Sequence, residues 1–231
     1  MGNIITIDGP AGSGKSTIAK IAARELGLKY IDTGAMYRAV TLAIIRSGID
    51  CSDEKSILKL ANKLKIELDK NSLDENKYTG IKINGVDVTE EIRGSEVGDS
   101  VSVVSKLSGV RKYLVGLQRR LVKDGNAVLE GRDTGSVVYP DAALKIFLTA
   151  SLEERIKRRD IQIRRKGVLI ERKEIKREIE SRDEIDSSRE DSPLVIPENG
   201  VVIDTTGMTI RDVADKIKNL YFKKINAEGK T

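Results

Sequence analysis

The strongest constraint on this chain is a phosphate-binding loop pattern that directly follows the apolar run 4–7. The pattern reads G-x-x-x-x-G-K-S, where glycines let backbone N–H groups turn around an anion and a following helix adds its positive end. In such a loop Lys15 reaches the β- and γ-phosphates of a nucleoside triphosphate, and the Ser16 hydroxyl ligates Mg²⁺. The loop consists of Gly9, Pro10, Ala11, Gly12, Ser13, Gly14, Lys15, Ser16 and Thr17.

The alternative to a phosphate-binding loop is a glycine-rich turn between a strand and a helix that binds no ligand. The phosphate-binding pattern requires a strand before the loop and an amphipathic helix after it. The helix is supplied by Ile18, Ile21, Ala22 and Leu26, all at helical spacing. We therefore favour triphosphate binding, which by itself leaves the fate of the phosphate open.

Composition narrows the class of protein. The 231 residues include 41 Lys and Arg against 36 Asp and Glu, a small excess that suits an enzyme of anionic nucleotides better than a nucleic-acid binder. Few aromatic residues are available for base stacking. Because histidine is absent, catalysis must use carboxylates, lysines and arginines. The single Cys51 excludes an intrachain disulfide and fits a reducing cytoplasm, and no apolar run is long enough to predict a membrane span.

Short apolar runs alternate with helical patterns along most of the chain. Runs at 4–7, 29–31, 127–129, 144–148 and 201–203 predict five strands. Such an order indicates a parallel sheet covered by helices on both faces, with ligands at the carboxyl ends of the strands. The unusual clusters lie at those ends, at 9–17, 32–38, 130–135, 149–159 and 204–208. Helix starts are predicted at Ser52, Ser151 and Thr209 by their capping residues.

One segment breaks this alternation. Runs at 66–68, 81–83 and 86–88 alternate apolar and polar residues, with an Asn84-Gly85 turn before the last run. These features predict a small inserted antiparallel sheet on the substrate side.

Arginines outside the loop suggest a second anionic site. Planar guanidinium groups bind phosphate in a bidentate way, although each arginine alone could equally form an exposed salt bridge of little energy. Phosphoryl transfer to a phosphate would also explain the missing histidine, because a monophosphate has a second pKa near 6 and needs little help in losing its proton. The arginines in question are Arg38, Arg111, Arg132, Arg182 and Arg189.

The helical segment 172–189 carries a possible functional face. Arg182, Asp186 and Arg189 follow one another at i, i+4 and i+7, so one face can present a donor, an acceptor and a donor. The alternative is a solvated helix, because acidic residues crowd the same segment and such pairs are common on exposed helices.

Taken together, several motifs resemble bacterial cytidylate kinases, which transfer the γ-phosphate of ATP to CMP or dCMP. The resemblance runs in order from residue 4 to about residue 215. Its motifs are the loop 9–17, the segment 32–38, Asn84–Thr89 with Ile92-Arg93, Val110-Arg111, Gly131–Gly135 with Val137–Pro140, and Arg182-Asp183 with Asp186 and Arg189.

The resemblance implies an α/β fold, a P-loop kinase core with a five-stranded parallel sheet. The ATP-binding core would comprise 1–64, 95–154 and 168–231. The segment 65–94 would be the inserted monophosphate-binding subdomain, and 155–167 would be a helical lid with a hinge near Gly167. The lid is rich in lysine and isoleucine, which departs from the family pattern and leaves its individual contacts open.

The resemblance also implies roles for single residues. Thr33, where serine is frequent in the family, would hold the acceptor phosphate with Arg38 and Arg189. Arg182 and Asp186 would bind the sugar hydroxyls, and Ser102, Arg111 and Asp133 would read the cytosine. Arg155 and Arg159 would bind ATP from the lid, with Thr206 beside the adenine. Lys15, Arg159 and Arg189 would be the catalytic residues.

The base assignment also agrees with hydrogen-bonding chemistry. Cytosine presents an amine donor beside two acceptors, which a carboxylate at Asp133 and a guanidinium at Arg111 match. Uracil would instead point a carbonyl at the carboxylate. A mispaired buried polar group costs about 1–3 kcal/mol, so Asp133 is expected to discriminate CMP from UMP.

The expected protein is a cytoplasmic, monomeric enzyme that uses ATP with Mg²⁺ and binds neither nucleic acid nor membrane. Ser16 is the expected metal ligand, with Asp8 and Glu130 as weaker candidates acting through water. Adenylate, uridylate or dephospho-coenzyme A kinases remain alternatives within enzymes. A nucleotide-dependent switch or nucleic-acid-binding module remains an alternative outside them.

Overall fold

The computed structural model describes residues 3–69, 73–74, 78–165 and 167–228. Parts of three predicted segments lie outside this range, namely 70–72 and 75–77 of the insertion, Lys166 of the basic helix, and the tail 229–231. Within the described part of the chain, no helix combines the length and apolar character needed to cross a membrane.

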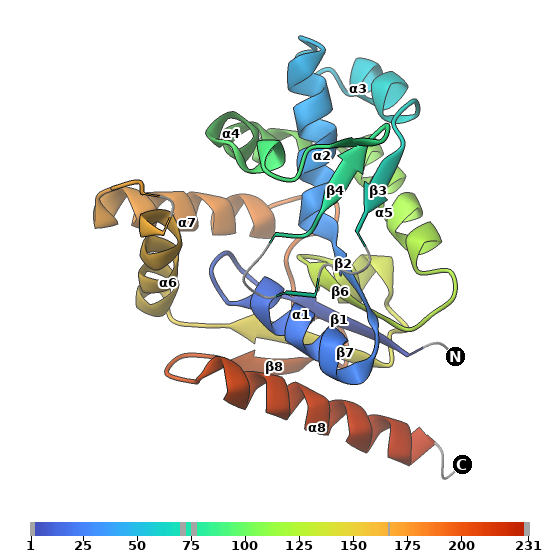
Figure 1. Cartoon of the computed structure of the whole chain (residues 1–231), viewed down its shortest axis with the longest axis vertical. Helices are drawn as coiled ribbons and strands as arrows, with labels where there is room; N and C mark the ends of the chain where they lie inside the picture. The colour runs from blue at the N-terminus through green and yellow to red at the C-terminus, as the bar shows by residue number, and fades with distance from the viewer. Residues whose placement is uncertain (1–2, 70–72, 75–77, 166, 229–231) are drawn as a thin grey trace.

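All five predicted strands form, and they assemble into one parallel sheet (Figure 1). The order across the sheet is β2-β6-β1-β7-β8. Neighbouring strands run parallel throughout, so their carboxyl ends meet at one edge. The strands are β1 (Ile4–Asp8), β2 (Lys29–Asp32), β6 (Ala127–Gly131), β7 (Leu144–Thr149) and β8 (Val201–Asp204).

Two helical layers cover the sheet, as the sequence predicts. Ile5 and Ile7 of β1 pack with α1 (Lys15–Leu26) and α8 (Ile210–Glu228) on one face. Ile4, on the opposite face, joins the core of the other layer. Since successive side chains of a strand point to opposite faces, both faces of this central strand are buried. The second layer comprises α2 (Thr33–Arg46), α3 (Glu54–Ala61), α4 (Ser95–Val104) and α5 (Ser108–Leu121).

Helix starts follow the capping residues, with one correction. Ser151 Oγ accepts a hydrogen bond from Glu154 N at 3.3 Å, as predicted for the start of α6. Thr209 Oγ1 likewise accepts from Asp212 N at the start of α8. The predicted cap Ser52 is wrong, because Asp53 caps α3 by accepting from Ser56 N.

Most of the cluster 32–38 lies within a helix. α2 begins at Thr33, because the Asp32 carboxylate accepts a hydrogen bond from Ala35 N at 2.9 Å and caps the helix. The polar residues of this cluster therefore lie on the first turns of a rigid helix that starts at the carboxyl edge of the sheet.

The predicted inserted sheet is present, with strands β3 (Ile66–Leu68), β4 (Ile81–Ile83) and β5 (Val86–Asp87). Asn84 and Gly85 have φ angles of 52° and 83°, the pair of positive values that a tight two-residue hairpin turn needs. The apolar side of the sheet packs into the core that contains α2. The short helical turn η1 (Glu91–Arg93) then leads into α4.

Two helices stand beyond the carboxyl ends of the strands, α6 (Leu152–Arg164) and α7 (Arg172–Ser187) (Figure 1). They pack on each other through a small apolar cluster of their own, consisting of Ile156, Ile163, Ile175 and Ile179. Gly167, at φ 74°, lies in the connection between them.

A buried carboxylate ties the central strand to the segment after β6. Asp8 accepts hydrogen bonds from Thr134 N, Thr134 Oγ1 and Gly135 N at 2.9, 2.8 and 2.7 Å. These bonds hold η2 (Thr134–Val138), a single turn of π-helix, against β1. A Cβ added at Gly135 would lie 2.6 Å from Thr6 Oγ1 and 3.3 Å from Asp8 Oδ2, so the approach requires glycine.

We predict opposite effects for one substitution at two glycines. Gly135→Ala should lower the free energy of unfolding by about 1–3 kcal/mol, because the new methyl group overpacks this junction. Gly98→Ala should raise it by about 0.5–1 kcal/mol, because Gly98 lies within α4 and nothing would lie within 4 Å of its Cβ. Urea denaturation of both variants measures the two changes, and a neutral Gly135→Ala would contradict the packing described here.

Candidate active site

The glycine-rich loop connects β1 to α1, and its conformation demands its glycines. Gly9, Gly12 and Gly14 all have positive φ angles. At Gly9 a Cβ would lie 2.0 Å from the carbonyl oxygen of Leu148 in β7, so only glycine lets the chain leave the sheet here. Gly14 then caps α1 in a left-handed conformation.

Lys15 turns its ammonium group back over the loop. Its Nζ donates to Pro10 O at 2.7 Å and lies 3.4 Å from Ser13 Oγ, which itself donates to Pro10 O. Burial, followed by the charge of Arg132, lowers the pKa of Lys15. The site therefore holds a cation that lacks a sufficient anionic partner.

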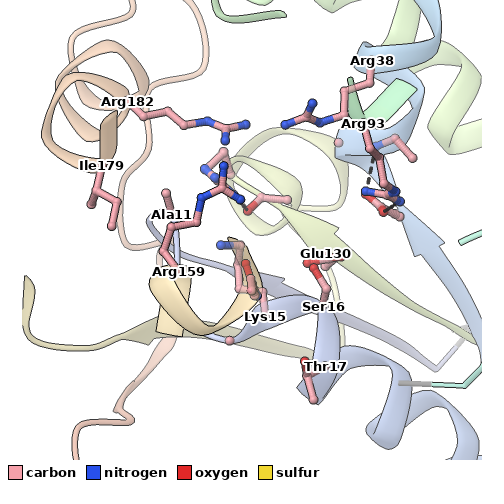
Figure 2. A pocket seen from close by; sticks show the side chains of 18 of the residues that line it. Ala11, Lys15, Ser16, Thr17, Arg38, Arg93, Glu130, Arg159, Ile179 and Arg182 are labelled. Carbon is pink, nitrogen blue, oxygen red and sulfur yellow. Dashed lines mark hydrogen bonds and ion pairs between the residues drawn. The ribbon is translucent and has the colours of Figure 1, made fainter. Parts of the chain in front are cut away.

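Two adjoining cavities open at the carboxyl edge of the sheet. The first, of about 230 Å³, extends from the glycine-rich loop to α7. Figure 2 shows Lys15, Ser16 and Glu130 on one side of it, with the Arg38 and Arg182 side chains pointing toward each other opposite them. The second, of about 90 Å³, lies among α2, α4, α5 and α7. Five residues line both cavities, namely Gly34, Arg38, Gly131, Arg132 and Arg182.

The boundary between the cavities is strongly positive. Burial, together with the charges of Arg132 and Arg38, lowers the pKa of Arg182 to about 10. Burial and the neighbouring Arg93 also lower the pKa of Arg38. Cations in this situation are stabilised by an anion placed among them, and guanidinium groups fit a phosphate.

The second cavity contains a buried ion pair that the sequence placed on two distant segments. Arg111 Nη2 bonds to Asp133, and the two side chains are only 3 % and 7 % exposed. Arg111 Nη1 also donates to Ser105 O at 3.0 Å, and its guanidinium lies 5.5 Å from the centre of the Tyr37 ring. Ser102 lines the same cavity. A donor and an acceptor thus stand side by side in a dry pocket.

The residues proposed as a functional face line the second cavity instead of facing solvent, although α7 ends at Ser187 and leaves Arg189 just beyond it. Asp186, which is 4 % exposed, accepts from Arg132 Nε at 2.6 Å and pairs with Arg189. Despite burial, the charges of these arginines lower the pKa of Asp186. Arg189 further contacts Ser105 Oγ at 3.2 Å. Thr33, on α2, donates to Glu130 O at 2.7 Å and lines the second cavity.

The oxygen atoms of Ser16 and Glu130 fit a magnesium ion that is also bound by phosphates. Mg²⁺ in nucleotide sites takes one or two protein oxygens, with phosphates and waters as the other ligands. The Ser16 side chain hydrogen-bonds Glu130, which also accepts from Tyr30 Oη at 2.5 Å. Among the described residues there is no group of three or more acidic or cysteine side chains that could hold a metal alone. Asp8 does not line either cavity and is used by η2.

Five residues expected to bind ATP lie outside both cavities, namely Gly9, Pro10 and Ser13 of the loop, and Arg155 and Thr206. Arg155 bonds to Asp183 and donates to Ala11 O at 3.2 Å, on the side of the loop that faces α6. Thr206 is exposed, and its hydroxyl accepts from Ser151 N at 2.8 Å. Arg159 lines the first cavity and donates to Glu178 at 2.7 Å. Their roles toward a nucleotide stay predictions.

Sequence reasoning missed several residues of the first cavity. Arg93, from η1, lines it with its guanidinium 4.1 Å from the centre of the Tyr78 ring and 3.6 Å from Asp32. Gln162 and Glu178 line it from α6 and α7. Arg93 followed a recognisable motif and could have been named. The two helical residues carried no signal, since charged and amide side chains are usual on helix surfaces.

Comparisons with known proteins agree on one family. A family model described as cytidylate kinase matches residues 5–223. A cytidylate kinase of Caldanaerobacter subterraneus subsp. tengcongensis is 46 % identical over 97 % of this chain and 96 % of its own length. One of Alkaliphilus oremlandii is 46 % identical over 94 % and 96 %. A crystal structure of an uncharacterised protein from Eubacterium ventriosum, 12 % identical, covers 94 % of this chain and 97 % of its own with a TM-score of 0.50, and shows the fold alone.

The lowered pKa of Lys15, about 7, predicts proton uptake on triphosphate binding. Above that pH the amine is largely neutral, and the negative phosphates should raise its pKa again, so binding at pH 8 should take up close to one proton. Below about pH 6 the amine is already charged and this uptake should vanish. Calorimetric titration with ATP in buffers of different ionisation enthalpy measures the number of protons.

The matched variants for this measurement are two lysine substitutions. Lys15→Met should abolish the uptake at pH 8. Lys218→Met should retain it, because Lys218 lies on α8 and pairs with Glu25 near the C-terminal end of α1, away from the loop. No uptake at pH 8 by the unaltered protein would contradict the prediction.

Proposed function

Because this chain belongs to the cytidylate kinase family, we propose that its two cavities bind ATP and CMP or dCMP and that it transfers the γ-phosphate between them. The observation that carries the proposal is the set of arginines that line both cavities, Arg38, Arg132 and Arg182. A phosphate bound among them could belong to an acceptor nucleotide whose base lies in the second cavity. It would also lie close to the γ-phosphate of ATP bound in the first cavity.

The first cavity would take the triphosphate of ATP. Backbone N–H groups of the glycine-rich loop and the start of α1 would bind the phosphates, with Lys15 bridging the β- and γ-phosphates. The lowered pKa of Lys15 supports this role. Negative phosphates beside the ammonium group would stabilise its charged form, which burial disfavours. Ser16 and Glu130 would hold Mg²⁺ directly or through water, and Mg²⁺ when bound supplies neutralisation of phosphate charge.

The second cavity would take the acceptor nucleotide. Arg38, Arg189 and Thr33 would hold its phosphate with Arg132, which the sequence indicated only as one of several arginines. Arg182 and Asp186 would bind the sugar hydroxyls. The Arg111–Asp133 pair would read cytosine with Ser102, because its carboxylate accepts from the base amine while its guanidinium donates to the acceptors.

The reaction depends on the positioning of the two phosphates more than on a general base. The acceptor phosphate is mostly ionised at neutral pH, so its oxygen attacks the γ-phosphorus directly and ADP leaves from the opposite side. The protein aligns the two phosphates and stabilises charge on the transferring group. Lys15 and Arg159 would do so from the donor side, and Arg189 would hold the acceptor.

We propose that the segment 155–167, which includes most of α6, acts as a lid that closes over both substrates and excludes water, which would otherwise accept the phosphate. The three remaining assignments, the core, inserted subdomain and lid boundaries, follow the family resemblance. A monomer in the reducing cytoplasm, as Cys51 suggests, completes the proposal.

An assay of ADP release with CMP, dCMP, UMP, AMP or no acceptor tests this function. CMP and dCMP should give the fastest turnover. Equal rates with every monophosphate would favour a different nucleotide kinase, and slow hydrolysis independent of any acceptor would favour a nucleotide-dependent switch.

Asp133→Asn should reduce the preference for CMP. The amide can donate to the uracil carbonyl, so the ratio of kcat/KM for CMP to that for UMP should fall about ten- to a hundredfold. Asp215→Asn, which changes an exposed carboxylate on α8, is the control and should leave the ratio unchanged. An unchanged ratio in Asp133→Asn would remove this residue from base recognition.

Arg159→Ala should lower kcat by about 10³ or more, as expected of an arginine that stabilises a transferring phosphoryl group. Arg177→Ala removes an exposed arginine of α7 and is the matched control. Steady-state kinetics with saturating ATP and CMP measures both. A loss below about tenfold in Arg159→Ala would exclude that role.

A further inference from the structure

Arg158 joins three elements around the glycine-rich loop without lining either of the two cavities. Its Nη1 donates to Ser13 O at 3.3 Å and to Thr205 Oγ1 at 2.9 Å. Its Nη2 donates to Thr205 O at 2.9 Å, and its Nε donates to Glu154 at 3.0 Å on its own helix. One side chain therefore connects α6, the loop and the turn that follows β8.

The contact with Ser13 O determines where the next amide points. In a trans peptide the carbonyl and the following N–H point in opposite directions, and the described residues contain no cis peptide bond. A Ser13 carbonyl held toward Arg158 therefore directs the Gly14 N–H away from Arg158. Gly14 lines the first cavity, the proposed site of the phosphates.

The same arrangement occurs two residues earlier in the loop, with an arginine one turn earlier on α6. Arg155 donates to Ala11 O at 3.2 Å, which directs the N–H of Gly12, another residue of the first cavity. Asp183 bonds to Arg155 and accepts from Ala11 N at 3.3 Å. Two arginines of α6 thus hold alternate carbonyl groups on the outside of the loop.

We propose that Arg158 is a positioning residue for the donor phosphates, which holds Ser13 O so that the Gly14 N–H is aimed at them before they bind. The identity of the donor as ATP rests on the proposed function. The fork of the guanidinium matters, because a single group must reach Ser13 O and both oxygens of Thr205 at once. Thr205 is 2 % exposed and also donates to Thr149 O at 2.9 Å, so it anchors the fork to the sheet.

A positioning role for Arg158 predicts effects on phosphate binding that a merely structural contact would not have. Loss of the fork should weaken phosphate binding while leaving the acceptor cavity intact. A lysine keeps the charge but cannot span the three acceptors, so it should not restore binding. Direct attraction between Arg158 and the phosphates would instead be restored largely by lysine.

The experiment measures equilibrium binding of ADP and of inorganic tripolyphosphate by calorimetry, and KM for ATP and for CMP. In both Arg158→Gln and Arg158→Lys, binding of the two phosphate probes should weaken about tenfold or more, the effect of a lost hydrogen bond to a charged group. KM for CMP should change less than about twofold. Arg211→Gln is the matched control, since Arg211 also pairs with a carboxylate on its own helix and one on another element.

A second variant guards against misfolding and tests the route of the effect. Thr205→Val keeps the side-chain shape but removes the hydroxyl that anchors the fork. If both residues act through Ser13 O, Arg158→Gln and Thr205→Val combined should weaken tripolyphosphate binding by much less than the product of their separate effects.

Three outcomes would overturn the proposal. They are tripolyphosphate binding within about twofold of the unaltered protein in folded Arg158→Gln, full recovery in Arg158→Lys, and a rise in KM for CMP equal to that for ATP. Tripolyphosphate contains no nucleoside, so its binding reports on the phosphate contacts without a contribution from adenine or ribose. If the unaltered protein fails to phosphorylate CMP, the proposed function fails while this inference is still tested.

Discussion

The site depends on the neutralisation of buried arginines by the carboxylates of α7. Arg132 and Arg189 share Asp186, and Arg155 bonds to Asp183. Arg159, whose side chain is 38 % exposed, bonds to Glu178 nearer the solvent. A charge removed from water without a partner costs several kcal/mol, so guanidinium groups concentrated for phosphates need acidic partners when no nucleotide is bound. The helix that supplies them also lines both cavities. The arginines are thus already gathered at the site before any substrate binds. Substrate phosphates can then become additional partners of the arginines, or take the place of these carboxylates.

The sheet brings this helix and the loop together at one edge. Parallel strands end at the same side, so β1, β2, β6 and β7 release their polar segments toward a common space. The bonds from Asp8 to η2 keep the segment after β6 close to the central strand, and Asp133 precedes that turn directly. The two cavities proposed for the donor phosphates and for the acceptor base are therefore neighbours because of strand order, and Arg38, Arg132 and Arg182 line both.

Most of the fold could be predicted from local patterns. Apolar runs located all five strands, and the Asn84-Gly85 dipeptide located the hairpin because few other residues tolerate its φ angles. One helix start was wrong because two capping residues stand side by side in the sequence, Ser52 and Asp53. The candidate site could be assembled from motifs through the family resemblance, with Arg111 and Asp133 expected to act on one base. Gln162, Glu178 and Arg158 could not, because a charged or amide residue on a helix looks the same in a sequence whether it faces water or a cavity.

The sequence by itself determined the phosphate-binding loop, the parallel sheet and the family, because these depend on residue types at short and regular spacing. Only the tertiary structure decided which arginines line the cavities and which hold the protein together. Arg155 and Arg158 stand four or fewer residues from Arg159, yet they bond to carbonyl oxygens on the outer side of the loop while Arg159 lines the cavity. Helical geometry spreads neighbouring side chains over different faces. Because α6 packs against the loop, Arg155 and Arg158 contact loop carbonyl groups, whereas Arg159 faces the first cavity.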